Sequence, residues 1–223
     1  RYDGPAIDRV AQFGAPGDIP VLGNWDGGSA TRIGVFRAGA WYLDFNGNGR
    51  YDGPAIDRFA QFGVPGDIPV VGNWDGGLAT RIGVFRAGAW YLDLNGNGVL
   101  EGPGVDLVGN LGQAGDIPVT GDWTGNGRSK AGVFRAGLWL LDINGNANWD
   151  GATTDRTGTF GQPGDKPVTG DWDGSGVVKA GFFRGGQWYL DVNGNLQWDG
   201  TPSDRMGTFG VAGDIPVVGR WPP

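Results

Sequence analysis

A repeat of 49 residues constrains this chain more than any other feature of its sequence. In steps of 49, a tryptophan recurs at Trp25, Trp74, Trp123, Trp172 and Trp221, and an aspartate recurs at Asp44, Asp93, Asp142 and Asp191. Such a period is typical of architectures built from repeated structural units. We therefore interpret 1–223 as a single repeat domain with units 1–49, 50–98, 99–147 and 148–196 and a partial unit 197–223.

Each unit contains four short strand-like runs, which clusters of Gly, Pro, Asp and Asn separate. In the first unit these runs are 7–13, 19–25, 31–37 and 40–45. The second and third runs carry apolar residues on both faces, so we expect their strands to be covered on both sides. These features predict an all-β fold, a β-propeller with four-stranded blades of about 49 residues; a β-solenoid, whose rungs are usually shorter, is the alternative.

The number of runs is uneven along the chain. The run containing Ile-Pro-Val, which reads Lys-Pro-Val in its fourth copy, and the run before it occur five times, whereas the two other runs occur four times each. Four complete blades and two terminal half-blade strands follow from this count. Because unpaired strand edges associate readily, we expect the terminal strands to pair with each other, with neighbouring blades or with other copies of the chain.

Composition excludes several classes of function. The formal charge is −7 without a basic tract, which argues against nucleic-acid binding. No apolar run approaches the length of a transmembrane helix, so we expect no membrane insertion. The first residue is Arg1 rather than Met, and we expect processing upstream of it. Cysteine and histidine are both absent, which removes thiolate and imidazole chemistry.

Acidic and amide residues alternate in a nine-position loop after the fourth run of each unit, called here the Asp/Asn loop. Positions 1, 3, 5 and 9 are oxygen donors in every complete copy, whereas position 7 varies, as it would if only its main-chain carbonyl were used. The predicted ligands at positions 1, 3, 5, 7 and 9 are Asp44, Asn46, Asn48, Arg50 and Asp52; Asp93, Asn95, Asn97, Val99 and Glu101; Asp142, Asn144, Asn146, Asn148 and Asp150; and Asp191, Asn193, Asn195, Gln197 and Asp199.

Calcium is the metal that this donor set indicates, because Ca²⁺ takes six to eight hard oxygen ligands. Glu101 keeps a carboxylate at position 9, which a simple turn does not require. The loop is not an EF-hand, since position 12 of the first copy is Ala55. An Asx-turn without metal is the alternative. Asp3, in the partial motif at residues 1–4, is a ninth-position ligand whose partners are missing.

A second loop in each unit, called here the basic loop, carries similar residue types but ends on a cation. Its copies are 24–32, 73–81, 122–130 and 171–179, and position 9 is Arg32, Arg81, Lys130 or Lys179. A cation at this position repels a metal ion and can neutralise the acids of the loop. We predict that the basic loops are metal-free and held by the basic side chain.

The unit F-G-x-P-G-D-I-P-V-x-G-[DN]-W-[DT]-G, followed by x-G-[VF]-F-R and W-Y-L-D-x-N-G-N-G, resembles the FG-GAP and VCBS-type repeats of bacterial and archaeal surface proteins. These repeats are related to the blades of integrin α-subunits. The resemblance covers essentially the whole chain and implies a calcium-bearing extracellular or cell-surface propeller for adhesion. It also implies that the Ile-Pro-Val strand is innermost and that four full blades span 18–211. In that family the metal loop usually follows the first strand, where this chain has Arg or Lys.

These patterns together predict a class of function. We expect a non-enzymatic extracellular module that binds Ca²⁺ and serves as an adhesive or structural scaffold. A carbohydrate-binding, lectin-like propeller that recognises glycans or surface proteins is the alternative, and a glycosidase with paired carboxylates is less favoured, because the acids recur in every unit.

Aromatic and ionic residues that recur once per unit have both structural and functional interpretations. We expect Trp25, Trp41 and their equivalents to be buried between blades, whereas Trp149 and Trp198 occupy position 8 of their loops and are candidate contact residues. Arginines that follow Phe, such as Arg37, recur together with aspartates such as Asp18. An inter-blade salt bridge or a turn cap is the preferred interpretation of that pair, and an anion or partner contact is the other.

Overall fold

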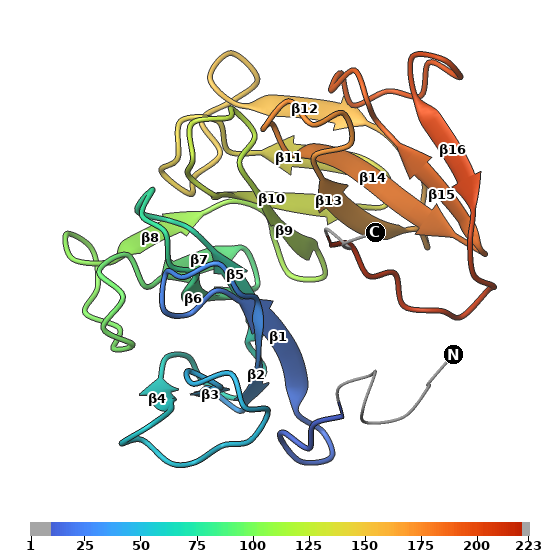
Figure 1. Ribbon diagram of the computed structural model, residues 1–223. Coiled ribbons are helices and arrows are strands. Elements are labelled where there is room, and N and C mark those ends of the chain that lie inside the picture. The colour runs from blue at the N-terminus through green and yellow to red at the C-terminus, as the bar shows by residue number, and fades with distance from the viewer. Residues whose placement is uncertain (1–9, 220–223) are drawn as a thin grey trace.

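The chain folds as a four-bladed β-propeller in the computed structural model, which describes residues 10–219 (Figure 1). No helix occurs within this range. Blade 1 consists of β1 (Ile19–Gly23), β2 (Arg32–Arg37), β3 (Ala40–Leu43) and β4 (Arg58–Gln61), and blade 2 of β5 (Ile68–Gly72), β6 (Arg81–Arg86), β7 (Ala89–Leu92) and β8 (Leu107–Asn110). Blade 3 consists of β9 (Ile117–Gly121), β10 (Lys130–Arg135), β11 (Leu138–Leu141) and β12 (Arg156–Thr159), and blade 4 of β13 (Lys166–Gly170), β14 (Lys179–Arg184), β15 (Gln187–Leu190) and β16 (Arg205–Thr208).

Each blade is an antiparallel meander in which strands pair in the order of the sequence. The first strands of successive blades, β1, β5, β9 and β13, pack against one another in turn, so they line the axis of the propeller. The Ile-Pro-Val strands are therefore innermost, as predicted. Four separate four-stranded sheets around one axis form a β-propeller and exclude the β-solenoid alternative.

The strands are shorter than the predicted runs, and the two terminal half-blade strands are not formed in the described residues. Residues 10–13 of the run 7–13 and residues 214–219 of the last Ile-Pro-Val run form no strand, and residues 7–9 lie outside the described part of the chain. The physical reason is that neither segment has a hydrogen-bonded neighbouring strand among residues 10–219, and a strand requires one.

The hydrophobic core is divided into three clusters, one at each contact between successive blades. The cluster between blades 1 and 2 contains Trp25, Trp41 and Phe62 of the first blade together with Ile82 and Val84 of the second. Equivalent clusters join blades 2 and 3 and blades 3 and 4. Trp41 is completely buried, and its Nε1–H donates to the carbonyl of Phe62 at 2.7 Å. The prediction of burial between blades is confirmed for the tryptophans of blades 1 to 3, whereas Trp172 and Trp188 of blade 4 are only half-buried and Trp221 lies outside the described residues.

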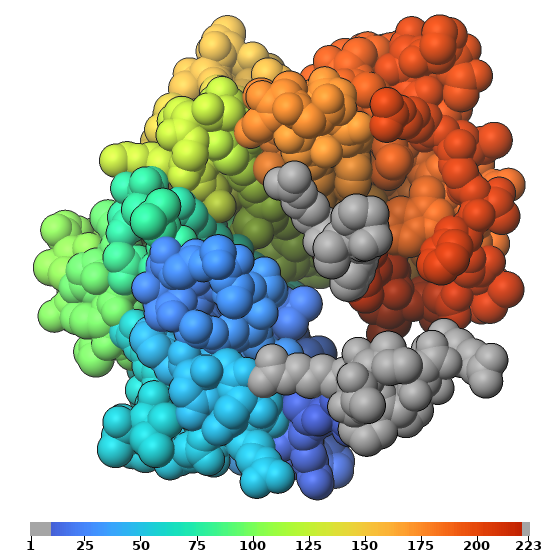
Figure 2. Space-filling view, in the orientation of Figure 1, coloured from blue at the N-terminus to red at the C-terminus, as the bar shows by residue number. Residues whose placement is uncertain are grey.

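Blade 4 and blade 1 do not share such a cluster in the described part of the chain. Figure 2 shows an opening between the blue first blade and the red fourth blade. Phe209, on the open side of blade 4, is 82% exposed, whereas its equivalent Phe62 is fully buried. The blades therefore differ in environment although their sequences are similar.

An ion pair joins the start and the end of the inner hairpin in each blade. Both side-chain oxygens of Asp18 accept hydrogen bonds from Arg37, at 2.6 and 2.7 Å, and Oδ2 also accepts from the main-chain N–H of Ala15. The aspartate thus caps the turn before β1, as predicted. The prediction that the salt bridge joins two blades was wrong. Both residues belong to one blade, and the β1–β2 register brings them together.

The different environments of equivalent tryptophans generate a stability prediction. Trp90→Ala removes a fully buried ring at the contact between blades 2 and 3 and should lower the free energy of unfolding by about 3–5 kcal/mol. The matched change Trp188→Ala should cost clearly less, because Trp188 is only half-buried on the open side of blade 4. Urea denaturation monitored by circular dichroism measures both values. Equal losses would contradict the division of the core into inter-blade clusters.

Candidate functional site

The Asp/Asn loops connect the third and fourth strands of each blade. Asp44, at position 1, follows β3 directly and is 2% exposed. Its Oδ1 accepts hydrogen bonds from the main-chain N–H groups of Gly47 and Asn48, and its Oδ2 accepts from that of Gly49 at 2.8 Å. The same pattern recurs at Asp142 and Asp191. The position-1 carboxylate therefore organises the main chain of the loop.

The asparagines at positions 3 and 5 point their amide nitrogens at the carboxylate of position 9. Nδ2 of Asn46 and Nδ2 of Asn48 donate to Oδ2 of Asp52 at 3.0 and 2.5 Å. Their side-chain oxygens accept main-chain N–H groups two residues further on, which is the Asx-turn arrangement. Each amide thus uses both ends within the loop.

Glu101 takes the same part in the second copy. Its Oε2 accepts hydrogen bonds from Nδ2 of Asn95 and Nδ2 of Asn97, at 2.7 and 2.6 Å. Retention of a carboxylate at position 9 therefore has an explanation that does not involve a metal, namely the acceptance of two amide N–H groups. These hydrogen bonds also hold the pKa of Asp52, Asp150 and Asp199 below the ordinary value, with the position-3 asparagine contributing first and the position-5 asparagine second.

A further carboxylate belongs to each Asp/Asn loop and was missed in the sequence. Asp57, five residues after Asp52, is 4% exposed, and its oxygens accept the main-chain N–H groups of Phe45 at 2.9 Å and Asp52 at 2.7 Å. The equivalents are Asp106, Asp155 and Asp204, all buried. Recurrence at the 49-residue period is the signal that could have found them.

Negative charge accumulates at these loops. Positions 1 and 9 and the aspartate equivalent to Asp57 bring three carboxyl groups to each copy, and none of them forms an ion pair with Arg or Lys within residues 10–219. Burial raises the pKa of Asp142, and the neighbouring Asp155 carboxylate raises it further; Asp191 and Asp204 repeat this relation. A cation bound at the loop would relieve this repulsion.

The donor chemistry of the Asp/Asn loop fits calcium, but its amide groups are turned away from such a use. Asp44, Asn46, Asn48, the Arg50 carbonyl and Asp52 would supply hard oxygen ligands. The nitrogens of both amides face Asp52, so Ca²⁺ would require the amides to turn their oxygens inward. No group of three or more acidic side chains converges on one point in the described residues. The calcium assignment stays a prediction, and Asp3 lies outside the described residues.

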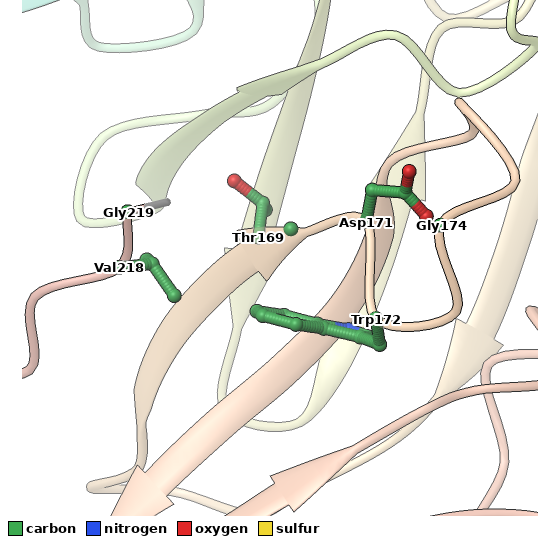
Figure 3. Close-up of a pocket in the computed structure, with 7 residues that line it drawn as sticks. Thr169, Asp171, Trp172, Gly174, Val218 and Gly219 are labelled. Carbon is green, nitrogen blue, oxygen red and sulfur yellow. The ribbon is translucent and has the colours of Figure 1, made fainter. Parts of the chain in front are cut away.

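A cavity of about 730 Å³ lies beside the inner strand of blade 4 (Figure 3). It is lined by Thr169, Gly170, Asp171, Trp172, Gly174, Val218 and Gly219. The only carboxylate among these residues is that of Asp171, which accepts main-chain N–H groups of its own loop from Ser175 at 3.0 Å and Gly176 at 2.8 Å. The carboxylate therefore serves the turn in the structure.

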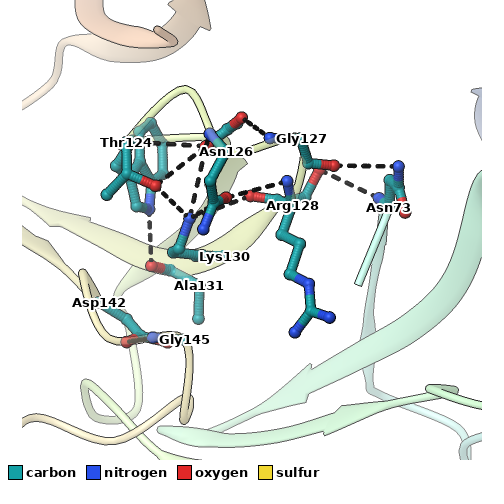
Figure 4. A network of polar contacts seen from close by, with 12 residues as sticks. Asn73, Thr124, Asn126, Gly127, Arg128, Lys130, Ala131, Asp142 and Gly145 are labelled. Atoms are coloured by element: carbon teal, nitrogen blue, oxygen red, sulfur yellow. Dashed lines mark hydrogen bonds and ion pairs between the residues drawn. The ribbon is translucent and has the colours of Figure 1, made fainter. Parts of the chain in front are cut away.

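The basic loops join the first and second strands of each blade, and the ammonium group of Lys130 lies among their oxygens (Figure 4). Its Nζ donates to Thr124 Oγ1 at 2.7 Å, to Asn126 Oδ1 at 3.0 Å and to the Arg128 carbonyl at 3.2 Å, and it pairs with Asp122 Oδ1 at 3.4 Å. These partners are positions 1, 3, 5 and 7 of the loop. The Lys130 side chain is 4% exposed.

The other basic loops are closed in a related way. Lys179 pairs with Asp173 at 2.5 Å, Arg81 with Asp75 at 2.6 Å and Arg32 with Asp26 at 2.7 Å. The hydrogen bond from Lys179 is the first cause that lowers the pKa of Asp173. The prediction that the basic side chain holds the loop is confirmed, and absence of metal from these loops stays a prediction.

The two candidate contact tryptophans differ in exposure. Trp198 is 41% exposed and makes an edge contact with Tyr189, with 5.3 Å between ring centroids. Trp149 is half-buried and packs against the cluster between blades 2 and 3. Only Trp198 is therefore available as a large exposed ring at position 8.

Comparison with known proteins leaves the family undecided, because no family model and no curated protein matches the chain. The β-propeller architecture is shown, whereas the FG-GAP or VCBS assignment rests on the sequence resemblance. Within residues 10–219, no helix has the length and apolar character needed to cross a membrane.

The buried ammonium generates a prediction about Lys130. Lys130→Met leaves the Asp122 carboxylate and the neighbouring oxygens without their cation, and we expect a loss of about 3–5 kcal/mol in the free energy of unfolding. Arg128→Met, which removes the same charge from an exposed side chain of the same loop, is the matched control and should change stability by less than about 1 kcal/mol. Chemical denaturation compares the two variants. Similar stability of the two variants would show that the ammonium is dispensable.

Proposed function

We propose that this protein is a non-enzymatic structural or adhesive module of an extracellular or cell-surface assembly and that its Asp/Asn loops bind Ca²⁺. Support comes from the repetition in all four blades of one acidic loop with a buried position-1 aspartate, and from the resemblance to FG-GAP and VCBS-type repeats. An enzyme would require one distinctive acid or nucleophile, whereas the acidic groups of this chain recur at equivalent places.

The observation that carries the proposal is the position of the Asp/Asn loops between blades. Ala147 and Leu196, at position 6, are 0% and 1% exposed, and they lie against Gly109 and Gly158 in the outer strands of the preceding blades. The main-chain N–H of Trp149 also donates to the carbonyl of Asn110 at 3.1 Å. A cation that makes the loop rigid would therefore strengthen the contact between two blades, which is a structural role.

In this proposal, calcium would neutralise the negative charge of the loop and fix the conformation of the loop. Bound Ca²⁺ would supply positive charge to a loop whose carboxyl groups have no ion-pair partner in the described residues. Asp44 and Asp52 would ligate through their carboxylate oxygens, and Asn46 and Asn48 through their amide oxygens. No chemical transformation is assigned to the site.

Thermal unfolding in Ca²⁺ and in EDTA tests the proposal. At a free Ca²⁺ concentration near 100 times Kd, each site that exists only in the native state adds about 2.7 kcal/mol, so the melting temperature should rise. Asp44→Asn with Asp52→Asn should reduce the rise. An identical melting temperature of the wild-type protein in both buffers would remove calcium from the proposal and leave the hydrogen-bonded form of the loop as its functional state.

Asn48→Asp separates the two forms of the loop more sharply within the same experiment. Without calcium, the new carboxylate faces Asp52 and loses an amide donor, so the melting temperature should fall. With calcium, the additional anionic ligand should recover or exceed the wild-type value. Asn126→Asp in a basic loop is the matched control, because Lys130 already occupies that loop, and calcium should not change its effect.

Glycan binding is the second candidate function, and the exposure of Trp198 favours it. A flat indole ring that is 41% exposed offers a surface on which a sugar ring can stack. Binding on a glycan array that is lost in Trp198→Ala but kept in Trp149→Ala is the expected result for this function. Absence of any bound glycan would leave the scaffold role alone.

A further inference from the structure

The open side between blade 4 and blade 1 has the features of an incomplete blade. Both described end segments contribute to it. Ala11 lies against Gly49 of the first Asp/Asn loop in the same way that Ala60 of β4 lies against Gly98 of the second. Residues 10–13 therefore occupy the place of an outer strand in front of blade 1.

The other end segment has the local structure of the turn that precedes an inner strand. The main-chain N–H of Val211 donates to Oδ2 of Asp214 at 2.9 Å, as that of Gln162 donates to Asp165 directly before β13. The Ile-Pro-Val residues that follow, 215–217, therefore correspond to an innermost strand. What is missing between such an inner strand and an outer strand is a second and a third strand.

The side chain of Asp214 indicates what the second strand must provide. In all four blades the equivalent aspartate binds an arginine that ends the second strand, with N–O distances of 2.6 Å in Asp18–Arg37, Asp67–Arg86, Asp116–Arg135 and Asp165–Arg184. No arginine lies opposite Asp214 in the described residues. The carboxylate is thus presented for a cation at the end of an additional strand.

The carbonyl of Phe13 indicates what the third strand must provide. In each blade a third-strand tryptophan donates its indole N–H to the carbonyl of the residue that follows the outer strand; the pairs are Trp41 with Phe62, Trp90 with Leu111, Trp139 with Phe160 and Trp188 with Phe209. Phe13 is the equivalent acceptor in the segment 10–13. No tryptophan of the described chain donates to it.

A cavity marks the place of the missing apolar side chain. It measures about 560 Å³ and is lined by Phe183, Trp188, Phe209, Gly210, Asp214, Ile215, Pro216 and Val217. In complete blades the glycine equivalent to Gly210 faces a side chain of the second strand, as Gly63 faces Val84 and Gly112 faces Val133. The exposed Ile215 and Phe209, each 82% accessible, border the space that such a side chain would fill.

We propose that this open side binds a free β-hairpin of the second-and-third-strand type, with the pattern Gly-Val-Phe-Arg followed by Ala-Gly and a tryptophan. The arginine pairs with Asp214, the tryptophan donates to the carbonyl of Phe13, and the valine enters the cavity beside Gly210. The partner thus completes a fifth blade by strand addition. The inference rests on the proposed scaffold function and identifies the kind of chain that the scaffold joins.

A second copy of this chain is a poor source of the hairpin. Each of its four hairpins of this type, β2–β3, β6–β7, β10–β11 and β14–β15, is already paired within its own sheet. Release of one of them would open a blade and expose its core. The ligand is therefore a hairpin with the same repeat pattern other than these four, and it is free to pair.

Binding of a synthetic peptide tests the proposal directly. The full chain is titrated against a fluorescently labelled peptide with the sequence of residues 80–93, and anisotropy measures the affinity. We expect saturable binding, together with slower hydrogen exchange at residues 10–13 and 211–218. Peptides that carry Arg86→Glu or Trp90→Ala should bind about tenfold more weakly or worse, which is about 1.4 kcal/mol for each contact.

Exchange of the charges at Asp214 and at Arg86 of the peptide tests whether these two side chains form the ion pair. Asp214→Arg should weaken binding of the wild-type peptide and restore binding of the Arg86→Asp peptide, whereas Lys166→Ala, which removes an ammonium that donates to the main-chain carbonyls of Gly213 and Asp214, should leave the selectivity between the two peptides unchanged. Asp214 is exposed, so the variant should fold, and an unaltered circular dichroism spectrum checks this.

Three outcomes would overturn the proposal. These are no binding at millimolar peptide, equal binding of the wild-type and Arg86→Glu peptides, and a dimer in analytical ultracentrifugation that the peptide does not dissociate. The last result would assign the open side to a second copy of the chain. None of these outcomes depends on calcium, so the Asp/Asn loops and the hairpin site fail or succeed independently.

Discussion

Packing of tryptophan rings between neighbouring blades is the interaction on which the rest of the structure depends. A single four-stranded sheet has two apolar faces and cannot cover either of them alone, so each blade is stable only against its neighbours. Trp41 and its equivalents fill these contacts, and their indole N–H groups bond to main-chain carbonyls that would otherwise be buried without a donor. The opening beside blade 4 is the place where this condition is not met.

The two kinds of loop place side chains at the same positions around a charged group, which is a cation in the basic loop and a carboxylate in the Asp/Asn loop. In the basic loop, side-chain oxygens at positions 1, 3 and 5 surround the ammonium group of Lys130. In the Asp/Asn loop, the amide N–H groups of positions 3 and 5 surround the carboxylate of position 9. Asparagine suits positions 3 and 5 for this purpose because it offers a donor to the carboxylate and an acceptor to the main chain at once. A cation would instead bind the side-chain oxygens of the same amides.

Much of the candidate site was predictable from residues that recur at the 49-residue period. The loop positions, the basic side chains that close the second loop and the burial of Trp25 and Trp41 follow from spacing and residue type. The direction in which Asn46 and Asn48 point their amides was not predictable, because an amide presents either end to a neighbour with almost the same shape. Asp57 was missed because it lies beyond the nine positions of the motif, although it contacts the main chain of the same loop.

The sequence by itself determined the all-β class, the number of strands in a blade, the repeat period and the two loop types, because these depend on local periodicity and turn chemistry. Only the tertiary structure decided which residues at the same position of the repeat have the same burial. Trp90 and Trp188 occupy the same position of the repeat, yet one is buried by the following blade and the other is half-exposed. Burial at such a position depends on a neighbouring blade that is remote in the chain, and no local pattern records whether that neighbour is present.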